Sequence, residues 1–246
     1  MDRLVYTAMT GARHVMEQQA TVANNLSNVS TTGFRAQLDS FRAVPVVSDG
    51  LQTRAFVVDS TVGADMRAGP IQTTGRPLDV AIRDQGWLAV TSADGSEAYT
   101  RNGSLKVSDN GLLQTQSGLT LVGDGGPIAI PPDTNISIAS DGTVSAISND
   151  FKPGPANVLG RLKLVNPDTK GLVRGNDGLF RQSSGEVAEN DPAVRLVDGA
   201  LEGSNVNAVD SMVNMISLAR QFEMQMSLLK NAENNAAKAT QILALS

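Results

Sequence analysis

The chain has 246 residues, of which 20 are basic and 25 acidic, giving a formal net charge of −5. This length is enough for one large domain or two modest domains with real cores. The charges form no long run of one sign, which argues against a nucleic-acid-binding stripe or a polybasic membrane patch. Cysteine is absent, so disulfides and thiolate metal sites are excluded.

The opening sequence, MDRLVYTAMTGARHVMEQQ, lacks the unbroken apolar segment of a secretory signal. Polar and charged residues interrupt it, namely Thr7, Thr10, Arg13 and His14. No apolar run in the chain approaches the roughly 18 residues that a membrane span requires. We therefore expect a protein that is soluble or leaves the cytoplasm without a cleaved signal, with no direct membrane insertion.

Apolar periodicity predicts a first long helix near the N-terminus, roughly 40 Å in length at the usual rise per residue. Its seam alternates steps of three and four through Val5, Ala8, Ala12, Val15, Gln19, Val22, Leu26 and Val29. Asn24 and Asn28, four residues apart, point elsewhere together. Gly33 supplies the positive-φ residue that commonly ends a helix, and Phe34 follows it. We expect Gly33 to end this helix.

A second heptad seam predicts another long helix from Ala208 to Leu245, about 57 Å in length. The seam runs through Ala208, Met212, Met215, Ala219, Phe222, Met226, Leu229, Glu233, Ala236, Thr240 and Leu243. Asn207, with Asp210 three residues on, is typical of a helix N-cap. The two seams fit each other in an intramolecular stalk, or other chains in an intermolecular bundle. Heptads do not distinguish these alternatives.

Between the helices the apolar period changes to two, which predicts short strands. They are expected at 78–82, 87–90, 105–107, 119–122, 127–130, 136–139, 161–165 and 193–197. Turn dipeptides such as Asp94-Gly95, Asn110-Gly111 and Asp141-Gly142 separate them. The less regular residues 37 to about 74 indicate an extended connector, and 149–157 the most exposed loop.

Catalytic motifs are missing from the sequence. His14 is the single histidine, so no multi-histidine metal centre can form. No G-x-S-x-G elbow occurs, and Gly123-Asp124-Gly125-Gly126 fits a turn better than a phosphate loop. A carboxylate pair brought together by folding stays open as an alternative, because its members need not be near in sequence. We expect no enzymatic activity, no cofactor and no metal.

Three long stretches resemble signatures of the bacterial flagellar rod and hook protein family. ANNLSNVSTTGFRA (23–36) is similar to its N-terminal signature, and LEGSNVNAVDSMVNMISLARQFEMQM (201–226) to its C-terminal one. Residues 75–123 resemble its shared middle region. The length argues against the hook protein, whose middle carries an extra domain. FRAVPV (41–46) and ARQFEMQM (219–226) are most similar to the proximal-rod branch. A distal-rod or hook-type member, a phage-tail-like protein and a β-rich hydrolase are the alternatives.

The resemblance implies an α+β fold in which long N- and C-terminal helices form a coiled-coil-like inner domain beside a β-rich middle domain. It places the inner-tube domain at 1–35 and 205–246, the connector at 36–74 and the β-rich outer domain at 75–204. Such proteins assemble helically into the periplasm-spanning rod of the basal body and transmit motor torque toward the hook. The implied partners are copies of itself, proximal and distal rod subunits and the flagellar type III export apparatus, with no nucleic acid.

The implied assembly interface lies in the two terminal signatures. Its first part is Val5, Ala8, Ala12, Val15, Val22, Asn24, Asn25, Leu26, Asn28, Val29, Gly33 and Phe34. Its second part is Asn205, Asn207, Met212, Met215, Ala219, Arg220, Phe222, Glu223, Met226 and Leu229. The apolar members would pack helix on helix, and the asparagine amides would bridge neighbouring backbones or side chains. Gly33 and Phe34 would turn the chain out of the tube.

Overall fold

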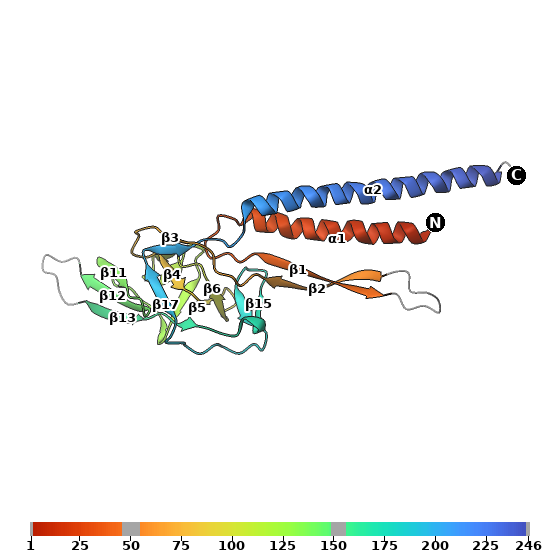
Figure 1. The fold of residues 1–246 in the computed structure, drawn as a ribbon. Helices are drawn as coiled ribbons and strands as arrows, with labels where there is room; N and C mark the ends of the chain where they lie inside the picture. Colours follow the sequence, from red (N-terminus) through yellow and green to blue (C-terminus); the bar gives the residue numbers. More distant parts are fainter. Residues whose placement is uncertain (1, 46–54, 149–155, 245–246) are drawn as a thin grey trace. The chain divides into compact units, whose positions relative to one another are not determined.

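The computed structural model describes residues 2–45, 55–148 and 156–244 (Figure 1). The chain forms two compact units. The helical unit contains residues 1–28, 36–64 and 206–246, and the β-rich unit contains residues 29–35 and 65–205. Compared with the expected boundaries, residues 29–35 and 65–74 thus belong to the β-rich unit and 36–64 to the helical unit. Most of the exposed loop expected at 149–157 lies outside the described residues.

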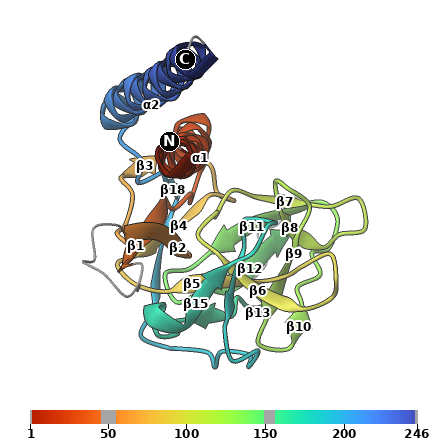
Figure 2. The ribbon, with the colours of Figure 1, turned by 90° about the vertical axis from the view of Figure 1, so that its right-hand side faces the viewer.

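The helical unit consists of two helices and a hairpin. Helix α1 spans Asp2–Ser27 and helix α2 spans Ala208–Ala244. They run side by side in Figures 1 and 2. Strands β1 (Gln37–Pro45) and β2 (Ala55–Ala64) pair antiparallel from Gln37↔Ala64 to Pro45↔Ala55, with a bulge at Ser40/Phe41. Strand β1 contacts α1, so the hairpin belongs to the same packed unit.

The prediction of a coiled-coil-like domain made by the terminal helices alone is wrong. The hairpin shares the unit, and Thr21 Oγ1 of α1 donates a hydrogen bond to Asp39 Oδ1 of β1 at 2.9 Å. The predicted seam of α2 also fails at alternate positions. Met212 and Met226 are 52% and 47% exposed, whereas Leu218, one residue before a predicted position, is only 8% exposed.

The face of α2 that packs inward differs from the predicted seam: at every second seam position, the inward residue is the one immediately before it. It comprises Ser211, Met215, Leu218, Phe222, Gln225, Leu229 and Ala232, all buried or half-buried. Small residues of α1 allow close approach, since a Cβ at Gly11 would stand 3.2 Å from Nε2 of Gln225. Among the described side chains of α1, Ala8, Ala12 and Val15 are buried. Apolar residues also lie elsewhere around α2, so periodicity could not identify the inward side.

The ends of the helices facing the loops are fixed by asparagines. Helix α1 ends at Ser27, where the Asn24 carbonyl accepts hydrogen bonds from Asn28 Nδ2 and Ser27 Oγ, both at 2.8 Å. Gly33 therefore does not end the helix, although its φ of +69° is in the expected region. The N-cap prediction is confirmed, because Asn207 Oδ1 accepts the Val209 and Asp210 N–H groups at 3.0 and 3.4 Å.

A large antiparallel sheet organises the β-rich unit (Figure 2). Its path is β15 (Leu172–Arg174), β16 (Phe180–Gln182), β6 (Glu97–Thr100), β5 (Trp87–Thr91), β9 (Thr120–Gly123), β8 (Leu113–Thr115) and β7 (Leu105–Val107). Strand β10 (Gly126–Pro127) pairs with β9, and β14 (Leu164–Val165) pairs with β5. A single-turn 3₁₀ helix, Thr169–Gly171, precedes β15.

Three smaller sheets complete the described part of this unit. One has the order β11 (Thr134–Ile138), β12 (Thr143–Ser148) and β13 (Asn157–Arg161). The others pair β17 (Arg195–Asp198) with β4 (Val80–Arg83) and β18 (Ala200–Glu202) with β3 (Ile71–Thr73). The core is mainly aliphatic, formed by residues such as Val80, Leu88, Val90, Leu105, Leu113, Leu121, Val144, Leu162 and Leu164. None of the helices in the described ranges combines the length and apolarity needed to cross a bilayer.

The inward face of α2 gives a stability prediction. Leu218→Ala should lower the free energy of unfolding of the helical unit by about 2–3 kcal/mol, because it empties a packed position. Met212→Ala should lower it by less than about 0.5 kcal/mol, because this side chain is half exposed. Urea unfolding followed by far-ultraviolet circular dichroism measures both. Equal losses for the two variants would contradict the displaced face.

Candidate functional site

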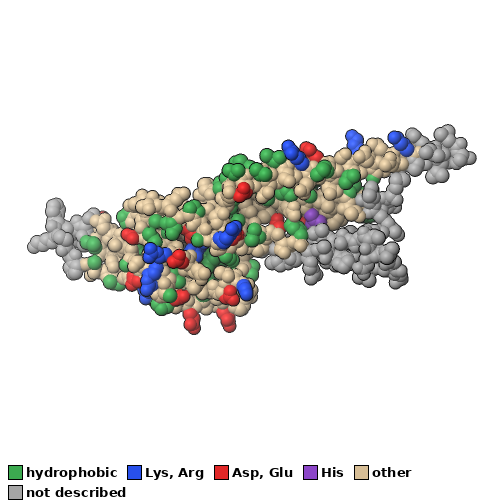
Figure 3. Space-filling model, in the orientation of Figure 1, with side chains coloured by type: hydrophobic (Ala, Val, Ile, Leu, Met, Phe, Trp, Pro, Cys, Tyr) green, Lys and Arg blue, Asp and Glu red, His purple; other side chains and the backbone are tan. Residues whose placement is uncertain are grey.

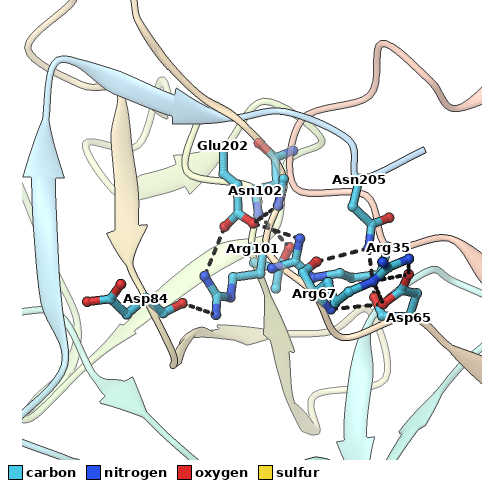
Figure 4. Close-up of polar contacts among 10 residues, drawn as sticks. Arg35, Asp65, Arg67, Asp84, Arg101, Asn102, Glu202 and Asn205 are labelled. Atoms are coloured by element: carbon cyan, nitrogen blue, oxygen red, sulfur yellow. Dashed lines mark hydrogen bonds and ion pairs between the residues drawn. The ribbon is translucent and has the colours of Figure 1, made fainter. Parts of the chain in front are cut away.

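A buried ionic cluster of Arg35, Arg101 and Glu202 lies in the β-rich unit (Figure 4). Arg35 Nη1 lies 2.6 Å from Glu202 Oε1, and Arg101 Nη1 donates to Glu202 Oε2 at 2.9 Å. Arg35 and Glu202 are each 1% exposed. One carboxylate thus serves two guanidinium groups, which leaves one positive charge in excess. Such charges are tolerated in a protein interior only when paired.

Trp87 provides part of that compensation. The Arg101 guanidinium carbon lies 5.3 Å from the centroid of the Trp87 ring, and that of Arg35 lies 6.0 Å away. Cations at these distances are attracted to the ring face. Arg101 Nη2 also donates to the Asp84 carbonyl at 2.8 Å. Burial lowers the pKa of Arg101, and the neighbouring Glu202 carboxylate opposes that shift.

Backbone pairing holds Glu202 in place. It is the last residue of β18, and its carbonyl accepts the Gly33 N–H at 2.8 Å. Its Oε1 accepts the Gly69 N–H at 2.9 Å. Arg101 directly follows β6, a strand of the large sheet. Segments from the beginning, middle and end of the sequence therefore meet at one carboxylate.

A second set of contacts adjoins the cluster around Phe34 and Asn205. Phe34 is buried, and the Arg174 guanidinium carbon lies 4.5 Å from its ring centroid. The Phe34 carbonyl accepts the Asn205 N–H at 3.3 Å. Asn205 Nδ2 donates to the carbonyls of Asp65 and Arg67 at 2.8 and 2.9 Å. The hydrogen-bonded Arg67 guanidinium holds the pKa of the Asp65 carboxyl below its usual value.

Gly33 fits against the backbone that carries Arg101. A Cβ at Gly33 would stand 2.4 Å from the Arg101 carbonyl carbon and 2.5 Å from the Asn102 nitrogen. The neighbouring Thr32 Oγ1 donates to Asn102 Oδ1 at 2.8 Å. Glycine is thus required here both by its positive φ and by the close approach of another backbone segment.

The predicted interface residues divide between the two units. Gly33, Phe34 and Asn205 come together in the β-rich unit, where Val29 is half-buried. In the helical unit the buried or half-buried members are Val5, Ala8, Ala12, Val15, Val22, Asn25, Leu26, Asn28, Met215, Ala219, Phe222 and Leu229. The exposed members are Asn24, Asn207, Met212, Arg220, Glu223 and Met226.

Asn25 shows what one of the early asparagines does within its own chain. Its Nδ2 donates to the Gln37 carbonyl at 3.0 Å, and its Oδ1 accepts the Gln37 N–H at 2.8 Å. The side-chain amide thus pairs with the start of β1 as another peptide group would. This pairing fixes the position of the hairpin on α1.

An exposed apolar stripe runs along α2. Its members, which we call the outer stripe, are Val209, Val213, Ile216, Arg220, Met224 and Leu228, and the apolar ones are at least 52% exposed. Figure 3 shows hydrophobic side chains gathered on this helix. Each of the first three lies two residues before an inward position, which is roughly 200° around the helix. The helix therefore presents apolar residues on two opposite faces.

The β-rich unit also has a concave polar surface. An open hollow of about 330 Å³ in the β-rich unit is lined by Arg83, Asp84, Asp191 and Arg195 among others. Asp191 Oδ1 accepts the Ala193 N–H at 2.8 Å and so closes a turn. Among the described residues there is no group of three potential metal ligands.

The ionic cluster was not predicted from the sequence. Arg35 stands inside the N-terminal signature but received no role, and neither did Arg101, Glu202 or Trp87. Their positions are far apart in the chain, and no spacing rule links them. The one local signal was Gly33-Phe34, which correctly marked an unusual backbone position.

Comparison with known proteins identifies the family. The model described as "Flagella basal body rod protein" matches residues 5–35, "Flagellar hook protein FlgE/F/G D1 domain" matches 81–146, and "Flagellar basal body rod FlgEFG protein C-terminal" matches 197–242. The flagellar basal-body rod protein FlgF of Escherichia coli K12 is 50% identical over the whole of both chains. FlgF of Salmonella typhimurium is 47% identical, also over the whole of both. FlgG of Bacillus subtilis is 30% identical over 95% of this chain and 96% of its own.

The chain belongs to the flagellar basal-body rod protein family, whose members are structural components of the flagellum. Within this family it is most like FlgF, as the high identity over its full length shows. The expected resemblance is confirmed.

Gly33 gives the first prediction from this site. Gly33→Asn and Gly33→Val should each lower the free energy of unfolding of the β-rich unit by at least about 2 kcal/mol, because any Cβ meets the Arg101 backbone. Gly75→Asn is the control, since Gly75 has a φ of +72° but nothing within 4 Å of its added Cβ. Fluorescence of Trp87, the single tryptophan, reports unfolding. Equal stability of Gly33→Asn and Gly75→Asn would contradict the close approach.

Asp65 gives a pH prediction. Because its pKa is lowered in the folded state, its contact with Arg67 stabilises the β-rich unit above the ordinary carboxyl pKa of 3.8. That stabilisation is lost as the pH falls through the lowered folded-state value. Asp65→Asn should therefore show a weaker fall in unfolding free energy between about pH 4 and pH 2 than wild type. A variant Asp65→Asn with the wild-type slope would contradict this role of the Asp65–Arg67 contact.

Proposed function

We propose that this chain is an axial subunit of the proximal rod, which assembles helically with copies of itself and with other rod proteins. In that position it transmits motor torque toward the hook. The observation that carries the proposal is the outer stripe of α2, because its own chain covers the opposite face of the same helix. A group of exposed apolar side chains on one face of a helix is typical of a protein interface.

The remaining faces of the helical unit suit the same role. Met212 and Met226 flank the outer stripe and are about half exposed. Methionine side chains adapt their shape readily to different partners, which suits a subunit that meets both its own kind and related rod proteins. Full-length identity to FlgF favours the proximal rod over a distal-rod or hook-type position.

The proposal also covers the export route of the chain and its non-catalytic role. We infer that the chain passes through the flagellar type III export apparatus and retains its N-terminal residues. The burial of Ala8, Ala12 and Val15 supports the retention of these residues, because they are part of the packed helix α1. The role is structural and non-catalytic, and it requires no cofactor.

The outer stripe is tested by adding a charge to it. Ile216 is 57% exposed, so Ile216→Glu should shift the melting temperature of the purified protein by no more than about 2 °C. In cells it should prevent rod completion and swimming, because an unpaired charge would be buried between subunits. Motility on soft agar and electron microscopy of basal bodies measure this.

The control is Gln221→Glu, which introduces the same side chain at an exposed position of α2 outside the outer stripe. It should leave rods and swimming intact. Normal swimming with Ile216→Glu would refute assembly through this stripe. A large drop in the melting temperature would show that Ile216 stabilises its own subunit.

A further inference from the structure

The chain passes between its two units four times, after residues 28, 35, 64 and 205. Three of the β-rich-unit residues at these passages are Arg35, Asp65 and Asn205, which all lie in the region drawn in Figure 4. We call the β-rich-unit segments that contain them, residues 33–35, 65–69 and 202–205, the exit segments. Every covalent connection except the one after residue 28 leaves the β-rich unit through an exit segment.

Hydrogen bonds join the exit segments to one another. Asn205 N–H donates to the Phe34 carbonyl at 3.3 Å, and Asn205 Nδ2 donates to the carbonyls of Asp65 and Arg67. One residue therefore binds both other segments. All three acceptors are backbone carbonyls, and Asn205 contributes both its backbone N–H and its side-chain amide.

The Glu202 carboxylate joins the same three segments a second time. It faces Arg35 from the first segment and accepts the Gly69 N–H from the second, while its own backbone belongs to the third. Through Arg101 it is also connected to the end of β6 and the face of Trp87. The exit segments are thus bonded both to one another and to the large sheet.

Stability alone does not account for this arrangement. A buried ion pair adds little net stability over well-packed apolar side chains of similar volume. The hydrogen bond from Arg101 Nη1 to Glu202 Oε2 is, however, charge-assisted and directional, and the Arg35 guanidinium faces the same carboxylate as an ion pair at 2.6 Å. An apolar contact can shift sideways under load, whereas a directional hydrogen bond between charged groups resists that motion.

We propose that the Arg35–Glu202–Arg101 cluster is a mechanical clamp on the exit segments. Load that reaches the β-rich unit along one segment is shared among all three and passed through Arg101 to the large sheet. The exit segments therefore do not separate from the β-rich unit one at a time. The mechanical part of this inference rests on the proposed function, in which the subunit transmits torque. The clamp itself is a property of the isolated chain.

The clamp is tested first in solution by amide hydrogen exchange on the purified full-length protein. Glu202→Gln removes the charge that both arginines share. We expect exchange at the N–H groups of Gly33, Gly69 and Asn205 to become at least about tenfold faster, because local opening frees these amides. The N–H groups of Leu113 and Leu162, bonded to the Ile128 and Gly142 carbonyls, should keep wild-type rates.

A matched control and a milder variant accompany this change. Glu189→Gln makes the same chemical substitution at an exposed residue of the same unit and should alter none of these rates. Arg35→Lys keeps the positive charge but replaces the planar guanidinium with an ammonium group, and it should accelerate the same three amides to a smaller extent. Unchanged rates in both cluster variants would overturn the clamp. Failure of both to fold would also overturn it, because the cluster would then be a requirement of the fold itself.

The mechanical role is tested in cells. Strains producing Glu202→Gln should form basal bodies in wild-type numbers and swim in dilute medium. Their swimming speed should fall by at least about half relative to Glu189→Gln when the medium is made viscous. Faster amide exchange with unimpaired swimming under viscous load would overturn the mechanical role. Absence of the wild-type protein from purified rods would instead refute the proposed function and leave the exchange results standing.

Discussion

The carboxylate of Glu202 is the group on which the organisation of the β-rich unit depends. It is shielded from water, and an ionised carboxylate in such a place is stable only with nearby donors. Two guanidinium groups and the Gly69 amide provide them, and each comes from a different part of the chain. The unit therefore cannot complete its interior from consecutive residues. The segment around Arg35 and the last strand, β18, must both be packed in place before the charge of the Glu202 carboxylate is compensated.

Local signals in the sequence were reliable where the structure they specify is local. The Asn207 N-cap and the positive φ of Gly95, Gly111 and Gly142 in their turns follow from side-chain reach and backbone sterics within a few residues. Strands rich in aliphatic residues were also found, including those around residues 80–83 and 87–91. Strands β6 and β12 were missed because they carry few large aliphatic side chains.

The failures share a physical cause, which is that the deciding partner is remote. The inward face of α2 is selected by the small residues of α1 and not by the apolar period of α2, which suits either side. Gly33 was correctly marked as special, but the reason is the backbone at Arg101, which no pattern near Gly33 reveals. The ionic cluster is the extreme case. Its three members occupy unrelated positions, and an arginine or glutamate in a single sequence is more often a solvated side chain than a buried one.

The two opposite faces of α2 have a consequence for how this protein can change over evolutionary time. Residues of the inward face, such as Leu218, are constrained by α1 of the same polypeptide, so a substitution there can be compensated within one gene. Residues of the outer stripe, such as Ile216, are constrained in the proposed assembly by other subunits, some of them encoded elsewhere. Residues of the inward face can therefore change within one lineage, together with a compensating residue of α1. Residues of the outer stripe can change only together with their neighbours, so exchanging the gene between distant bacteria should expose incompatibilities along one side of a single helix.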